Sequence, residues 1–89
     1  MTLDRDEIQQ AIKRKVVELA DLLGCDANDL GYDELIPASG YIDSAGLLEL
    51  IAWFESTYAF RIPSADLTID NLGSVAQMTE YLLSKRQPT

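Results

Sequence analysis

Apolar residues recur at helical spacing near the start of the chain. They step by four, four, three and four positions and therefore share one face of a helix: Ile8, Ile12, Val16, Leu19 and Leu23. Such a stripe is typical of an amphipathic helix that buries one side. Asp4 and Glu7 have the spacing of a capping box, and Gly24 can end the helix in the left-handed conformation. The pattern predicts a first helix from about Asp4 to Gly24.

A second helical pattern runs from about residue 44 to residue 58. At about 100° per residue, five apolar side chains fall on the side that faces the core: Leu47, Leu50, Ile51, Phe54 and Tyr58. The opposite side and its flanks carry Ala45, Leu48, Glu49, Ala52, Trp53 and Ser56. Because this outer face mixes small residues, acids and large apolar groups, it suits a docking surface.

The connection between these two helices, residues 25–43, shows no regular period. A connection of this length is usually functional or internally packed. We expect four apolar residues to hold it against the core: Leu30, Leu35, Ile36 and Ile42.

The last part of the chain predicts a short helical turn followed by a third main helix. Residues 64–73 form a connector with three apolar anchors: Leu67, Ile69 and Leu72. The final helix begins at Ser74, which has capping-box spacing with Gln77. The fold class is therefore all-α: a small four-helix bundle with three main helices, a short third helix and a long loop between the first two. We expect one domain over residues 1–89, with a core of about 3–85 and a frayed C-terminal tail.

Charge is distributed unevenly along the chain. There are 15 acids and 7 bases, a formal net charge of -8. Between Lys15 and Arg61 the sequence has no Lys or Arg, whereas nine acids fall there. Nucleic acid is disfavoured as a partner, because phosphate binding needs clustered Lys and Arg side chains. The acidic stretch instead favours a partner protein with a basic surface. We expect a cytoplasmic monomer without a membrane span, since Cys25 is the only cysteine and no long apolar run occurs.

Several kinds of chemistry are excluded by composition. The chain has no histidine, so a Ser-His or Cys-His nucleophilic site cannot be built. Residues 26–31 resemble the start of a calcium loop, but Leu30 and Pro37 stand where ligands are required. We therefore expect no catalytic residue and no metal site.

Ser44 stands between Asp43 and an abrupt change to helical apolar periodicity. One interpretation is an N-cap, because a serine oxygen can accept a hydrogen bond from a first-turn N–H group. A second interpretation is a hydroxyl displayed at a helix start for modification by another enzyme. The residues around it extend the second interpretation over most of the chain: Gly40, Asp43-Ser44, Leu48-Glu49-Leu50-Ile51, Glu55, Phe60-Arg61-Ile62-Pro63 and Asn71-Leu72-Gly73-Ser74-Val75.

In this combination the chain resembles the acyl carrier protein family. The resemblance implies that Ser44 carries 4′-phosphopantetheine, transferred from coenzyme A by a Mg²⁺-dependent phosphopantetheinyl transferase. The protein then catalyses nothing itself, and its prosthetic thiol holds an acyl or aminoacyl group as a thioester for a loading ligase or transferase and for downstream acyl-processing enzymes. Asp43 either helps organise the Mg²⁺ and the basic groups of the transferase or is a helix-start charge. The candidate partner contacts are Ala45, Leu48, Glu49, Ala52 and Glu55.

Two departures from the family pattern concern the pathway. Ala45 follows the serine where leucine is usual, and Gly46 is a poor helix residue that adds flexibility to the first turn. These differences favour a stand-alone carrier in a dedicated polyketide, modified-lipid or amino-acid-loading pathway over bulk fatty-acid synthesis. The alternative is a small acidic interaction module in which Ser44 is unmodified and serves as the N-cap.

Overall fold

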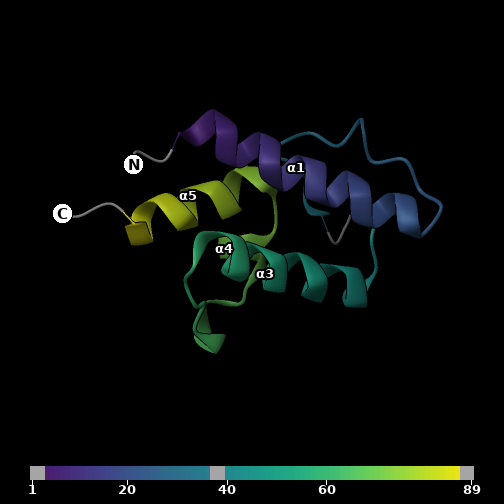
Figure 1. Cartoon of the computed structure of the whole chain (residues 1–89). Helices are drawn as coiled ribbons and strands as arrows, with labels where there is room; N and C mark the ends of the chain where they lie inside the picture. Colours follow the sequence, from purple (N-terminus) through teal and green to yellow (C-terminus); the bar gives the residue numbers. More distant parts are fainter. Residues whose placement is uncertain (1–3, 37–39, 87–89) are drawn as a thin grey trace.

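The described part of the chain is all-helical and contains no strand. The computed structural model describes residues 4–36 and 40–86, with Ser44, Ile69, Asp70 and Arg86 by their backbone alone. The elements in chain order are α1 (Arg5–Leu22), α3 (Ser44–Tyr58), the 3₁₀ turn η1 (Ser64–Asp66), α4 (Ile69–Leu72) and α5 (Val75–Arg86). This confirms the all-α class and the positions of the three main helices (Figure 1). The predicted C-terminal tail lies outside the described residues.

The first helix has the capping residues that the sequence predicts at both ends. Asp4 is the N-cap, and its side chain accepts a hydrogen bond from the Asp6 N–H at 2.9 Å. At the other end Gly24 has φ +78°, and the N–H groups of Gly24 and Cys25 donate to Asp21 and Ala20. These two bonds form a Schellman motif, which the left-handed glycine permits. Leu23, predicted to face the core, is instead the exposed C-cap, because the chain has already left the helix there.

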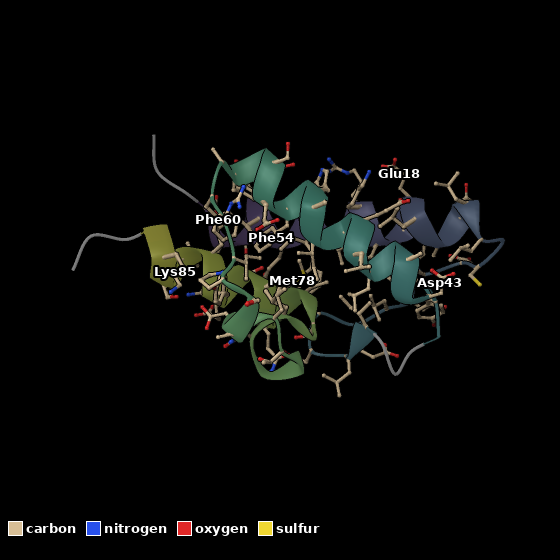
Figure 2. All side chains as sticks on the ribbon, turned by 90° about the horizontal axis from the view of Figure 1, so that it is seen from below. Glu18, Asp43, Phe54, Phe60, Met78 and Lys85 are labelled. Atoms are coloured by element: carbon tan, nitrogen blue, oxygen red, sulfur yellow. The ribbon has the colours of Figure 1, made fainter. Side chains whose placement is uncertain are left out.

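The core lies between α1, α3 and α5. Leu50 and Phe54 of α3 are fully buried, and Leu47, Ile51 and Tyr58 pack against them at the edge, which confirms the predicted core face. In Figure 2 Phe54 and Met78 point into the space between α3 and α5. The Phe54 ring meets the Phe60 ring edge to face, with centroids 5.2 Å apart, a favourable arrangement of aromatic pairs.

The connection after α1 packs on the core at three of the four predicted anchors. Leu30, Ile36 and Ile42 are buried, and so is Ala27, which the sequence did not single out. Leu35 is wrong as an anchor, since its side chain is 41% exposed. The reason is a backbone bond: the Ile36 N–H donates to the Gly73 carbonyl at 2.7 Å, which turns Ile36 inward rather than its neighbour.

Three further hydrogen bonds tie the same connection to α1 and to the start of α5. Lys13 of α1 donates through Nζ to the carbonyl oxygens of Asn28, at 3.0 Å, and Leu30. The Ala76 N–H donates to the Tyr32 carbonyl at 2.8 Å. The described part of this connection is therefore fastened at several points and follows a defined path.

The connector before α5 is held by polar contacts in addition to Leu72. Leu72 is buried as predicted, whereas Leu67 is 44% exposed and is wrong as an anchor, and the Ile69 side chain lies outside the description. The Tyr81 hydroxyl donates to Asp66 Oδ2 at 2.7 Å, and Lys85 Nζ lies 3.8 Å from the same oxygen. Burial of Tyr81 and its bond to Asp66 raise the pKa of the tyrosine to about 12. Asp66 thus fixes η1 to α5.

The last helix begins one residue after its predicted start. Ser74 precedes Val75, and its Oγ accepts a hydrogen bond from the Gln77 N–H at 3.1 Å, which confirms the serine cap. Val75, Met78 and Leu82 are fully buried, so the predicted stripe faces the core.

Candidate functional site

The site begins with the hydrogen bonds at the start of α3. Asp43 is the N-cap: its Oδ1 accepts from the Gly46 N–H at 2.8 Å, and its carbonyl accepts from the Leu47 N–H at 2.9 Å. Ser44 is the first helical residue. The interpretation of Ser44 as the N-cap is therefore wrong, and the cap lies one residue earlier. Asp and Ser cap helices about equally well, so packing on either side of the pair decides the register.

Gly46 has a packing role in this first turn. It is buried, and a Cβ added to it would lie 3.1 Å from Ile42 Cβ and 3.4 Å from Asp43 Oδ1. Since Ile42 is itself buried, the missing side chain lets Ile42 and the capping carboxylate close over the turn. The sequence suggested that Gly46 adds flexibility here; the structure instead shows a tightly packed position. The signal available in the sequence was a residue of low helix propensity in the first turn of a helix.

Four of the five candidate partner contacts lie exposed on the outer side of α3. Ala45, Glu49 and Ala52 are exposed, and Leu48 is 66% exposed. Glu55 differs from them: it is half-buried, and its Oε2 accepts from the Ile62 N–H at 2.7 Å. Glu55 therefore stabilises the turn that follows α3, a role that no local pattern indicated. The other four residues, together with Asp43, form one outer surface that extends from the start of α3.

The electrostatic character of this end of the molecule is acidic. Both views place the C-terminal end of α1 and the N-terminal end of α3 at the same end, and Figure 2 shows Glu18 and Asp43 toward it. Glu18, Asp21, Asp26 and Asp43 are all exposed. The backbone and side-chain hydrogen bonds from Asn28 lower the pKa of Asp26, so this carboxylate stays charged at neutral pH.

The described residues contain neither a cluster of possible metal ligands nor a helix that could span a membrane. Within 4–36 and 40–86, no group of three or more His, Cys, Asp or Glu side chains could hold a metal ion. Over the same residues, every helix is too short or too polar to cross a membrane.

The site is thus a serine at the first position of a capped helix in an acidic, all-helical chain. The family profile described as the phosphopantetheine attachment site matches residues 16–82, a span that includes the start of α3. The chain belongs to this family of phosphopantetheine-binding carrier proteins. The family resemblance of the sequence is thereby confirmed.

Curated relatives point the same way. The chain is similar to the D-alanyl carrier proteins of Streptococcus pyogenes serotype M1, serotype M49 (strain NZ131) and serotype M5 (strain Manfredo). Each is 30% identical over 70 residues, which cover 79% of this chain and 89% of the relative. No solved structure matches the chain.

Family membership fixes the general function. The protein is a thioester carrier of a dedicated pathway, and its cofactor is covalently attached 4′-phosphopantetheine. Carrier proteins of this family are not themselves catalysts, and they work with phosphopantetheinyl transferases and ligases.

Proposed function

We propose that Ser44 carries the 4′-phosphopantetheine and that the cargo is an amino acid, as the name D-alanyl carrier protein states for the relatives. The observation that carries the proposal is the position of Ser44. It is the first residue of a 15-residue helix, directly after the capping Asp43, and it lies within the matched span. Its neighbours Asp43 and Ala45 are exposed, so an enzyme can approach the backbone at this point.

The start of α3 fits the charge of the group. The first N–H groups of a helix have no intrahelical partners, and the helix dipole is positive at this end. Both features favour a phosphodiester on the first residue. Since Asp43 supplies the cap to Gly46, esterification of Ser44 leaves that hydrogen bond intact.

The attachment step is a phosphoryl transfer. The Ser44 oxygen forms a bond to the phosphorus that bears the pantetheine arm and loses its proton, while the pyrophosphate bond of coenzyme A breaks and the nucleotide bisphosphate leaves. Once attached, the arm supplies a thiol on which cargo is held as a thioester. The residues of this chain hold the reacting serine at an exposed helix start and present a surface for the enzymes that visit it.

The remaining expectations form part of the same proposal. Ala45, Leu48, Glu49 and Ala52 contact partner enzymes, and Glu55 contributes to them only through the turn that it holds. Asp43 assists the transferase in addition to capping. The protein works as a non-catalytic cytoplasmic monomer and as a single domain over residues 1–89. Its helices form the four-helix bundle, with a long loop, that is expected for the family.

Modification of Ser44 is tested by intact-mass measurement after incubation with coenzyme A, Mg²⁺ and a phosphopantetheinyl transferase. The wild type should gain one phosphopantetheine, and peptide mapping should place it on Ser44. Ser44→Ala should gain none. Ser56→Ala is the matched control, because Ser56 is an exposed serine of the same helix, and it should be modified like the wild type. A mass increment on Ser44→Ala would overturn the assignment.

The cargo is tested separately with the modified protein. A D-alanine-activating ligase with ATP should load D-alanine onto the thiol, and neutral hydroxylamine should release it, as it does from a thioester. Loading with a fatty acid but with no amino acid under matched ligase assays would reject the aminoacyl assignment and leave Ser44 as the attachment residue.

A further inference from the structure

Two neighbouring leucines at the end of α1 are exposed without a role in the fold. Leu22 is the last helical residue and 76% exposed, and Leu23 is the C-cap and 49% exposed. Leu22 is the most exposed large apolar side chain among those of the described residues. The core side of α1 already ends at Leu19 and Ala20, and backbone bonds of Gly24 and Cys25 complete the helix end. Folding therefore gains little from either leucine.

The leucine pair lies at the same end of the molecule as Ser44. α1 and α3 pack against each other, and the C-terminal end of α1 and the N-terminal end of α3 point to the same end of the fold in both views (Figures 1 and 2). An enzyme that acts on the start of α3 therefore comes close to the end of α1. An exposed apolar pair in such a place is typical of an interaction surface.

The surroundings of the pair define the charge of its partner. Glu18, Asp21, Asp26 and Asp29 are exposed and close to it in the chain. Lys15 pairs with Glu18 at 3.3 Å, but no Lys or Arg occurs between Lys15 and Arg61 to offset the other acids. A second copy of this chain would bring like charges together, and an anionic lipid surface would be repelled. The fitting partner is a protein with an apolar contact surface and a rim of Lys and Arg.

We propose that Leu22 and Leu23 form a docking contact for the phosphopantetheinyl transferase. The proposal rests on Ser44 as the modified residue. A transferase must bind coenzyme A, whose phosphates require Lys and Arg around the active site. That active site has to reach Ser44, so its basic rim falls on the acidic end of the carrier. The leucine pair supplies the apolar centre of the contact, and the charged groups form the solvent-accessible rim around it.

The test compares matched substitutions of exposed leucines. Gln keeps length and helix propensity while removing apolar surface, so Leu22→Gln and Leu23→Gln are combined in one variant. The control is Leu67→Gln, because Leu67 is 44% exposed and follows η1, far from the start of α3 in both figures. Circular dichroism and Trp53 fluorescence establish that both variants are folded. Initial rates of phosphopantetheine transfer from coenzyme A then give kcat and KM.

The leucine-pair variant should show a KM for the carrier raised about tenfold with kcat nearly unchanged, and the control should match the wild type. The leucine-pair variant should also keep the salt dependence of the wild type, because its acids remain. If the pair variant and the wild type have equal KM values, the docking contact is rejected while Ser44 stands as the attachment residue. An equal loss in the Leu67→Gln control also rejects it, because the effect would then not belong to this end. If the wild type gains no phosphopantetheine on Ser44, the proposed function and this docking contact are both rejected.

Discussion

Asp43 caps α3 and Ser44 does not, so substitutions of the two residues should change the free energy of unfolding by different amounts. Asp43 Oδ1 accepts from the Gly46 N–H at 2.8 Å. Removing an N-cap side chain costs ~1 kcal/mol, within a range of about 0.5–2 kcal/mol, and removing a carboxylate from a helix N-terminus adds about 0.3–1 kcal/mol. Asp43→Ala loses both contributions, so we expect destabilisation of about 0.8–3 kcal/mol. Ser44→Ala leaves the cap in place and should change the free energy of unfolding by less than about 0.5 kcal/mol.

Asp43→Asn separates the cap from the charge. The amide oxygen can accept the same hydrogen bond, and Asn caps helices about as well as Asp. Asn should therefore lose only the charge contribution, about 0.3–1 kcal/mol at low salt, and this loss should shrink as salt rises. The same variant tests the second role of Asp43. A lower rate of phosphopantetheine transfer, measured under conditions in which the variant is fully folded, would show that the transferase uses the charge.

Urea unfolding followed by Trp53 fluorescence measures all three variants, since Trp53 is the only tryptophan and packs against the core. For a domain of this size, a loss of about 1 kcal/mol corresponds to a fall in Tm of roughly 4–8 °C. The reasoning is refuted if Ser44→Ala is destabilised as much as Asp43→Ala, because the cap would then depend on the serine. It is equally refuted if Asp43→Ala is as stable as the wild type.

Three further predictions follow from contacts elsewhere in the fold. Ala59 ends α3 with φ 54°, so Ala59→Gly should raise the stability by about 0.5–1 kcal/mol and the Tm with it, and a lower Tm would contradict the strain at this residue. The pKa of Tyr81 is raised to about 12 from 10.0. The contribution of Tyr81 to the free energy of unfolding is therefore present below pH ~10 and is lost as pH rises toward about 12. Tyr81→Phe should abolish that part of the pH dependence in unfolding titrations. Glu49→Lys should slow association with the transferase in stopped-flow measurements at low salt. Glu55→Ala should lower the Tm, because Glu55 bonds the turn after α3. The two roles are refuted if Glu49→Lys lowers the Tm without slowing association and Glu55→Ala slows association without lowering the Tm.

The sequence predicted the helices well where the signals are local. Asp4, Gly24 and the Ser74–Gln77 pair mark helix ends within a few residues of the groups that they bond, so spacing alone identifies them. The apolar stripes were reliable except at Leu23, where the helix has already ended, because a helix with one buried face has to repeat its apolar residues at that period.

The errors arose where distant parts of the chain decide. Leu35 and Leu67 are apolar like their neighbours, but bonds made by Ile36 and by Asp66 to distant residues determine which side chain turns inward. At the candidate site, Asp43 and Ser44 are both good caps, so the choice between them depends on the packing of Ile42. The sequence also gives no sign that Glu55 bonds the turn after α3, because that bond spans seven residues and leaves no periodic signal.

The described part of the connection between α1 and α3 is hydrogen-bonded both to α1 and to the residues around the start of α5. Lys13 holds the carbonyls of this segment from α1, and Ala76 and Gly73 hold it from the start of α5. The described segment up to Ile36 thus links the first and last helices. A flexible tether tolerates added or deleted residues at small entropic cost, but a brace fixed at both ends does not. A one-residue deletion between Ala27 and Ile36 would therefore strain the packing of α1 against α5.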